Sequence, residues 1–203
     1  VKDAARQIAP FLKKGDLVIL ESTSPVGTTL EIAELLAEMC PNLSFPHIEG
    51  DSADVNVAYC AERVLPGNII AELCDNDRII GGLSLRSSEK AKELYQIFVK
   101  GECILTNAAT AEMVKLTENA ARDVQIAFAN EVSMICDKLE INDADVISLA
   151  NRHPRINILQ PGPGVGGHCI AVDPWFIVDK APNESTLIKT ARQLNDAKPL
   201  WVI

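Results

Sequence analysis

The sequence predicts an α/β fold in two parts: a layer of short parallel strands that alternate with helices, followed by an all-helical region. Over roughly the first hundred residues, compact apolar runs alternate with amphipathic helical patterns, which is typical of a parallel sheet covered by helices. Beyond them, a stretch without Gly or Pro extends from Thr110 to about Leu139, which indicates one long helix. We therefore expect the boundary between the two parts near residue 108.

Short apolar runs define the strands of the first part. The run DLVILE follows Gly15, and such near-continuous apolar runs are typical of parallel strands that are buried on both faces. Strands are expected at residues 16–21, 55–60 and 102–106, and another at 78–80 that runs into a strand end at Gly81-Gly82. Helices are expected at residues 4–12, 28–39 and 89–99, and Ser87 is the expected N-cap of the last of these.

The long helix dominates the second part. Thr110 is its expected N-cap, and an apolar stripe along it predicts a domain spine or a subunit interface. Its polar flank, which includes Arg122, Asp123 and Asn130, is interpreted as a solvated face. A shorter helix is expected at 142–150, a Pro- and Gly-rich loop at 152–167, and further helices at 174–180 and 184–198.

Composition excludes several classes of protein. The 203 residues are 47% hydrophobic and 23% charged, which excludes a disordered tail, a collagen-like fibre and a coiled-coil rod. The net charge of −9 argues against a partner that is a nucleic acid or an anionic membrane. The chain begins within a helical pattern and has no signal-peptide pattern, so we expect a segment of a longer, cytoplasmic protein.

Six cysteines stand at positions 40, 60, 74, 103, 136 and 169. They form no CxxC pair and only three histidines accompany them, so no metal site is expected. The first five are interpreted as buried free thiols in a reducing compartment.

The sixth, Cys169, lies in the glycine-rich segment QPGPGVGGHCIAVDP, residues 160–174. This segment contains GxGxxG, but no strand precedes it, so a dinucleotide-binding fingerprint is not favoured. The preferred interpretation is a loop that brings backbone close to a ligand and presents Cys169 as a nucleophile near a helix start at Pro174. A merely buried cysteine is the alternative.

Other segments carry further candidate chemistry. Lys115 and Asn119 are four residues apart, so they share one helix face and could stabilise an oxyanion, or they could belong to a solvated face. The segments 21–27 (ESTSPVG) and 59–67 (YCAERVLPG) follow strands, and ligands of open α/β sheets bind beyond strand carboxyl ends. Glu62 could act there as a general base for water; ordinary loops are the alternative.

The segment NRHPRIN, residues 151–157, holds two guanidinium groups suited to phosphate or sugar contacts. Its lone histidine, His153, is interpreted as structural.

The motifs ESTSPVGT, YCAERVLPG, AEMVKLTENAARD, NRHPRIN and GPGVGGHCIAVDPWF together resemble the UDP-glucose/GDP-mannose dehydrogenase family over essentially the whole chain. Their forms are most similar to the branch that acts on UDP-N-acetyl-D-mannosamine. The family's PER triplet reads Ala61-Glu62-Arg63 here, and Pro66 stands where the UDP-glucose branch has a second glutamate.

The resemblance implies that residues 1–108 are the C-terminal part of a Rossmann-like NAD-binding domain. Residues 109–203 would form the helical central domain, with a homodimer built on the helix at 110–139. The family's GxGxxG half and its C-terminal domain have no counterpart in these 203 residues.

The family oxidises the C6 alcohol of a nucleotide sugar to a carboxylate, with NAD as the cofactor and no metal. By resemblance, Cys169 attacks the C6 aldehyde to give a thiohemiacetal and then a thioester. Lys115 and Asn119 would hold the oxyanion. The implied catalytic residues are Cys169, Lys115, Asn119, Asp173, Glu62 and Thr23. The implied substrate-binding residues are Arg155, Glu62, Arg63, Gly166, Gly167 and His168, and those for NAD are Ser22, Thr23 and Glu62.

Three alternatives remain open at this point. The substrate could be UDP-glucose, UDP-N-acetylglucosamine or GDP-mannose. The segment alone could be a non-catalytic dimerisation core that binds no NAD. A cysteine-dependent hydrolase is disfavoured, because the adjacent His168 is poorly placed to act as the base for Cys169.

Overall fold

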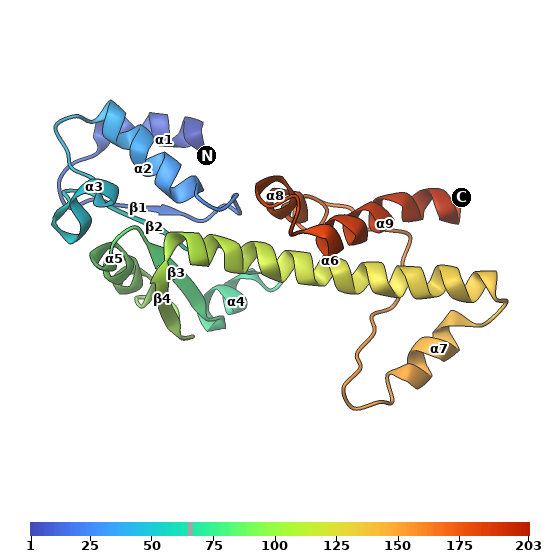
Figure 1. The fold of residues 1–203 in the computed structure, drawn as a ribbon. Coiled ribbons are helices and arrows are strands. Elements are labelled where there is room, and N and C mark those ends of the chain that lie inside the picture. The colour runs from blue at the N-terminus through green and yellow to red at the C-terminus, as the bar shows by residue number, and fades with distance from the viewer. Residues whose placement is uncertain (65–66) are drawn as a thin grey trace. The chain divides into compact units, whose positions relative to one another are not determined.

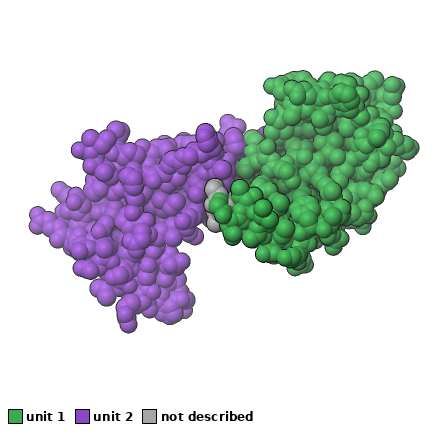
Figure 2. Space-filling model, turned by 180° about the vertical axis from the view of Figure 1, so that it is seen from behind, with its two compact units in different colours: residues 1–115 green, residues 116–203 purple. Residues whose placement is uncertain are grey.

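The computed structural model describes residues 1–64 and 67–203 and divides into two compact units, residues 1–115 and 116–203 (Figure 2). Leu65 and Pro66, which belong to the YCAERVLPG motif, lie outside the described residues.

Unit 1 contains a sheet of four strands in the order β1-β2-β3-β4 (Figure 1). The strands are β1 (Leu17–Leu20), β2 (Asn56–Tyr59), β3 (Arg78–Gly82) and β4 (Cys103–Asn107), all within or next to the expected ranges. The pairs β1–β2 and β3–β4 are parallel, as expected, but β2 and β3 are antiparallel. Parallel pairing needs a crossover connection, usually a substantial helix, and among the described residues of this connection the helix is the seven-residue α4 (Ile69–Asp75).

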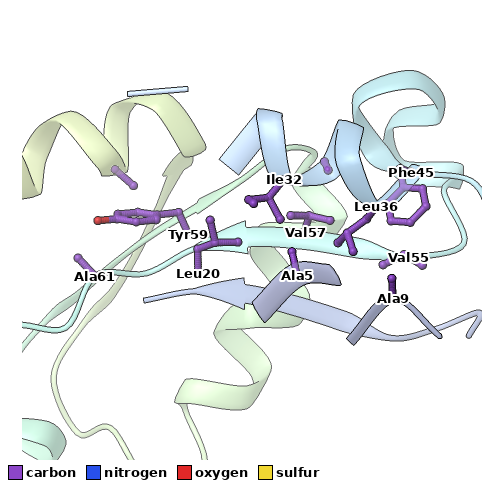
Figure 3. Close-up of a cluster of buried hydrophobic side chains, with 12 residues drawn as sticks. Ala5, Ala9, Leu20, Ile32, Leu36, Phe45, Val55, Val57, Tyr59 and Ala61 are labelled. Atoms are coloured by element: carbon purple, nitrogen blue, oxygen red, sulfur yellow. The ribbon is translucent and has the colours of Figure 1, made fainter. Parts of the chain in front are cut away.

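Helices cover both faces of this sheet. The helices α1 (Lys2–Ile8) and α2 (Thr28–Met39) belong to one face, and α5 (Leu85–Tyr95) to the other. Because side chains alternate along a strand, Val57 and Tyr59 pack with Ile32 and Leu36 in one core cluster (Figure 3), whereas Ala58 packs in the other. The 3-10 helix η1 (Ala9–Phe11), helix α3 (Pro46–Glu49) and 3-10 helix η2 (Gly50–Ser52) complete unit 1.

The helix caps differ from expectation at two places. Ser84, not Ser87, caps α5, because the Ser84 hydroxyl accepts a hydrogen bond from the Ser87 backbone N–H at 3.2 Å. Ser87 is buried inside the helix, where its hydroxyl accepts from the Val57 N–H of β2. Likewise, the Thr110 N–H donates to the Asn107 side chain at 2.8 Å, so the capping oxygen comes from Asn107. Several residues able to cap stand within one turn, so residue type alone does not select the cap.

The long helix α6 (Ala108–Lys138) begins in unit 1 and continues into unit 2. Unit 2 adds α7 (Asp143–Ala150), α8 (Asp173–Lys180) and α9 (Thr186–Val202), and an irregular segment links α7 to α8. The polar flank of α6 is not a solvated face: Asp123 and Asn130 are fully buried and bond to α9, although Arg122 is exposed. Within the described residues, no helix is long and apolar enough to span a membrane.

Candidate active site

The first group of candidate residues follows the carboxyl ends of β1 and β2 in unit 1. The Cys60 N–H donates to the Leu20 carbonyl at 2.9 Å, and the Glu62 N–H donates to the Glu21 carbonyl at 3.3 Å. These bonds continue the pairing of the two chain segments past the strands. Ser22 and Thr23, after β1, therefore share one sheet edge with Glu62 and Arg63, after β2. In open α/β sheets, ligands bind beyond the carboxyl ends of the strands, which is this edge.

Glu62 is held by a buried cation that sequence reasoning missed. Its Oε1 accepts from the Arg63 N–H at 2.7 Å and lies 3.4 Å from Nη1 of Arg78. The Glu62 side chain is 40% exposed, whereas that of Arg78 is 1% exposed. Arg78 also donates to the Leu73 carbonyl at 3.0 Å and faces the Tyr95 ring. The arrangement leaves Glu62 open to solvent but fixed in direction.

Two buried groups, Tyr95 and Cys60, lie next to this edge. The Tyr95 hydroxyl donates to Glu21 at 2.5 Å. Burial raises the pKa of the Cys60 thiol to about 11, and burial also raises the pKa of Tyr95. Cys60 therefore stays a thiol at neutral pH and is not a nucleophile, although it belongs to the YCAERVLPG motif.

Glu112 of α6 anchors the loop that carries Ser22 and Thr23. Its buried carboxylate accepts from the Gly27 N–H at 2.6 Å and from the Thr29 N–H at 2.7 Å. This places an anion at the N-terminus of α2, where the helix dipole favours negative charge. Lys115 lies half-buried, three residues further along the same helix. A sequence signal for Glu112 existed, because it stands four residues before Leu116 on the apolar stripe of α6.

Unit 2 brings three of the candidate residues together. The Asn119 side-chain amide donates to the Asp173 carboxylate at 2.5 Å, and Asp173 is 3% exposed. The N–H groups of Val172 and Asp173 donate to the Cys169 carbonyl at 3.0 and 2.9 Å. Cys169 therefore sits directly before α8 and beside the Asn119–Asp173 pair.

The six cysteines all lie in the described residues, and of them only Cys169 is exposed. The alternative of a buried Cys169 is therefore wrong. Cys60, Cys103 and Cys136 are buried as expected, but Cys40 and Cys74 are only half-buried. The Cys40 thiol donates to the carbonyl of Ala9, the first residue of η1, at 3.2 Å.

The glycine-rich segment is a loop seated on α6 and α9, as interpreted from the sequence. The Gly162 N–H donates to Oδ1 of Asn130 at 2.9 Å. Gly164 has a φ of +133°, and a Cβ there would lie 3.0 Å from the Asn195 carbonyl and from the Pro199 ring. A side chain at Gly164 would be strained by the positive φ and crowded by these two residues. Arg192 of α9 donates to carbonyls of the same loop, a contact that the sequence did not predict.

The remaining candidates are surface residues. Gly166, Gly167 and His168 are exposed beside Cys169. Arg155 is exposed, and its backbone N–H donates to Nδ1 of His153 at 3.3 Å, which agrees with a structural role for that histidine. In the part of the chain that the structure describes, no hydrogen bond or ion pair joins Arg155 to the loop of Cys169.

Comparison with known proteins decides the family. Residues 1–99 match the NAD binding domain of the UDP-glucose/GDP-mannose dehydrogenase family, and residues 109–197 match its central domain. The chain belongs to this family. NAD is accordingly the cofactor of its N-terminal part, as expected.

Curated members of the family match the whole chain. It is 66% identical over 203 residues to UDP-N-acetyl-D-mannosamine dehydrogenase of Escherichia coli (strain K12) and 64% identical to NDP-N-acetyl-D-galactosaminuronic acid dehydrogenase of Ralstonia nicotianae. Each match covers 100% of this chain and 48% of the relative, so the chain spans about half the length of these proteins. The structure of UDP-D-ManNAc dehydrogenase from Pyrococcus horikoshii matches with a TM-score of 0.91 and 45% identity, over 98% of this chain and 46% of that one.

The sheet edge of unit 1 fits the cofactor of the UDP-glucose/GDP-mannose dehydrogenase family. Two hydroxyl side chains, Ser22 and Thr23, and the carboxylate of Glu62 stand at the carboxyl ends of adjacent parallel strands. Hydroxyl and carboxylate oxygens are suitable partners for the ribose hydroxyls of a dinucleotide.

Proposed function

We propose that the complete protein containing this chain is an NAD-dependent UDP-N-acetyl-D-mannosamine 6-dehydrogenase, which oxidises the C6 alcohol to a carboxylate. One observation carries the proposal: the exposed Cys169, set beside the Asn119–Asp173 pair in a family of nucleotide-sugar dehydrogenases. In this proposal, residues 1–108 are the C-terminal part of the NAD-binding domain and residues 109–203 are the central domain.

Cys169 is the proposed nucleophile. NAD⁺, when bound, supplies the hydride acceptor for both oxidations. In the first oxidation, C6 loses a hydride and its hydroxyl loses a proton to water, which gives the aldehyde. The thiolate of Cys169 then adds to C6 of the aldehyde, forming a C–S bond and an oxyanion, to which Lys115 and Asn119 donate hydrogen bonds. Loss of hydride from C6 turns this thiohemiacetal into a thioester. Water then adds to C6, the C–S bond breaks, and the carboxylate and the free thiol are released.

The other proposed site residues bind NAD or the sugar nucleotide, or position the attacking water and the catalytic side chains. Glu62 accepts the proton of the attacking water, with Thr23 beside that water, and Asp173 holds Asn119 in place through the 2.5 Å hydrogen bond. Ser22, Thr23 and Glu62 bind NAD. Arg155 donates to the diphosphate of the sugar nucleotide, since a guanidinium suits bidentate contacts with phosphate. Arg63, Gly166, Gly167 and His168 line the sugar.

The substrate is tested by turnover. The complete protein is incubated with NAD⁺ and, separately, UDP-N-acetyl-D-mannosamine, UDP-glucose, UDP-N-acetylglucosamine or GDP-mannose, and NADH absorbance is recorded. We expect the highest kcat/KM with UDP-N-acetyl-D-mannosamine. A higher kcat/KM with a sister sugar would move the substrate assignment, and no NADH with any of the four would remove the activity.

The covalent mechanism is tested by Cys169→Ala, with Cys40→Ala as the matched control because Cys40 is a half-buried thiol of unit 1. We expect Cys169→Ala to abolish net NADH production and Cys40→Ala to retain it. Full turnover by the Cys169→Ala protein would rule out Cys169 as the nucleophile.

A homodimer through residues 110–139 is supported by exposed apolar side chains along this segment. Phe128 and Ile135 of α6 are 53% and 52% exposed, and their seven-residue spacing places these apolar side chains along one helix face; Leu139, directly after the helix, is 59% exposed. We expect Phe128→Glu with Ile135→Glu to give a monomer in sedimentation equilibrium, whereas Asp137→Asn, an exposed change on the opposite side of the same helix, leaves a dimer. An unchanged dimer in the double variant would place the interface elsewhere.

A further inference from the structure

We propose that Arg192 is a positioning residue for Cys169, because its buried guanidinium clamps both ends of the exposed segment 166–169. This inference rests on the proposed role of Cys169 as nucleophile. It concerns a residue of α9 that carries no chemistry itself but fixes where the nucleophile stands.

The clamp is defined by two backbone carbonyls. Nη1 of Arg192 donates to the Ile170 carbonyl at 3.3 Å, and Nη2 lies 3.5 Å from the Val165 carbonyl. These two residues stand immediately before and after the segment Gly166-Gly167-His168-Cys169, all four of which are exposed. A segment with two adjacent glycines has wide backbone freedom. Holding its two ends on one planar guanidinium restricts that freedom and so restricts where the Cys169 thiol lies.

The guanidinium is fixed in turn by the long helix. Nη1 of Arg192 lies 2.5 Å from Oδ1 of Asp123, and both side chains are 0% exposed. Asn195, one turn along α9, donates to the Asp123 backbone carbonyl at 3.0 Å and to its carboxylate at 2.8 Å. Burial raises the pKa of the Asp123 carboxyl, and the hydrogen bond from Asn195 and the Arg192 charge oppose that shift.

The pair is poorly suited to stability alone. Burying two charges is costly, and well-packed apolar residues of similar volume are often at least as stable. Moreover, within residues 1–64 and 67–203, Nε of Arg192 and Oδ2 of Asp123 have no hydrogen-bond partner. A role in holding the loop explains a buried pair with unpaired polar atoms better than a contribution to stability does.

Neighbouring contacts bind the rest of the loop to the same polar network. Nδ2 of Asn130 donates to Oδ1 of Asn195 at 2.9 Å, while Oδ1 of Asn130 accepts from the Gly162 N–H. Gly164 packs against the backbone of α9. Among the described hydrogen bonds of this network, those of Arg192 alone reach the residues on both sides of segment 166–169. Arg192 is therefore the member of the network that most directly holds the backbone around Cys169.

The test uses Arg192→Lys in the complete protein. Lysine keeps the charge beside Asp123, but its single ammonium cannot present a planar fork to two carbonyls. We expect kcat to fall by about 10- to 100-fold with an unchanged KM for NAD⁺, in line with the cost of a small displacement of a reacting group. Hydrogen exchange should become faster at the amides of Val172 and Asp173, which bond to the Cys169 carbonyl, with α7 unaffected.

Asp196→Asn is the matched control. Asp196 is 53% exposed and accepts from Nη2 of the same guanidinium at 2.9 Å, so this change removes the negative charge of one Arg192 contact without touching the loop. We expect wild-type kcat and exchange. If Arg192→Lys does not fold, the double variant Arg192→Gln with Asp123→Asn removes both buried charges together and is expected to show the same fall in kcat and the same faster exchange.

The outcomes separate the clamp from the proposed function. Wild-type kcat and wild-type exchange in a folded Arg192 variant, with Cys169→Ala inactive, would overturn the clamp and leave the nucleophile in place. A fully active Cys169→Ala protein would overturn the proposed function instead. Lower thermal stability with unchanged kcat per folded protein would show a purely structural role and would also overturn the clamp.

Discussion

Glu112 and Thr29 are joined by two hydrogen bonds although they stand 83 positions apart: the Glu112 carboxylate accepts from the Thr29 backbone N–H at 2.7 Å and from its hydroxyl at 2.6 Å. Both residues are fully buried. These two hydrogen bonds connect two parts of the proposed site. The loop after β1, which carries the proposed NAD-binding residues Ser22 and Thr23, is attached to the start of α6, the helix that carries Lys115.

The first prediction concerns this attachment. Glu112→Gln replaces an oxygen that accepts hydrogen bonds by an NH₂ group, which leaves at least one buried N–H or hydroxyl of the α2 N-terminus unsatisfied. We expect the opening free energy of the Thr29 amide to fall by roughly 1–3 kcal/mol, measured by hydrogen exchange. Glu131→Gln, an exposed change on the same helix, should shift it by less than about 0.5 kcal/mol. Equal effects from the two changes would contradict an anchoring role for Glu112.

The second prediction concerns the end of β3. A Cβ at Gly81 would lie 2.5 Å from the Asn107 carbonyl and 2.7 Å from the Ala111 side chain, where β4 passes into α6. Gly81→Ala therefore requires backbone displacement, and we expect it to lower the unfolding free energy by about 1–3 kcal/mol or more. Gly162→Ala is the control, because a Cβ there meets nothing within 4 Å. Thermal melts of the two proteins give the comparison, and similar midpoints would refute the crowding argument.

The third prediction concerns alkaline pH. Burial raises the pKa of Cys60 from an ordinary value of 9.0 to about 11, so between these values the unfolded chain loses the thiol proton and the folded chain keeps it. The folded state is then favoured fully below pH 9 and loses this advantage as the pH rises toward 11. The slope is up to about 1.4 kcal/mol per pH unit for the one group. Tyr95, whose pKa is also raised by burial, adds in the same direction.

Cys60→Ala removes the thiol and should flatten the fall in unfolding free energy over this range, as followed by urea denaturation at pH 8 to 11. A fall of undiminished slope in Cys60→Ala would show that the Cys60 thiol is not the titrating group.

Local elements were predictable because their patterns are local. The bounds of α2 agree with the expected helix at 28–39, since apolar spacing and the glycine before it mark both ends. The antiparallel pairing of β2 and β3 was not predictable, because strand direction depends on the path of the connection and not on the composition of either strand. The caps of α5 and α6 were missed for a related reason: Ser84 and Asn107 compete with equally suitable neighbours.

The residues of the candidate site also fall into those that the sequence predicted and those that it did not. Cys169 could be singled out from its glycine-rich loop, Asn119 from its four-residue spacing to Lys115 and Asp173 from the resemblance to the family, and the structure brings Cys169, Asn119 and Asp173 together. Glu112 and Arg192 were missed, since each acts through a partner far away in the chain, and Arg78 was missed because its contact with Glu62 joins two different elements. Asp123, for example, pairs with Arg192 across 69 positions, and without that partner it resembles any charged residue on a helix.

The last prediction uses the pair Asn119 and Asp173 to separate stability from chemistry. Asn119→Asp places two carboxylates within hydrogen-bonding distance in a mostly buried place, where like charges repel and a shared proton is required. We expect a lower thermal midpoint and loss of NADH production. Adding Asp173→Asn restores one carboxylate and one amide with their positions exchanged, so the hydrogen bond can form again and the midpoint should recover. Turnover should not recover, because the amide that donates to the oxyanion then stands on α8 and not one turn from Lys115 on α6. Recovery of both stability and turnover in the double variant would show that the pair serves only to hold the two helices together.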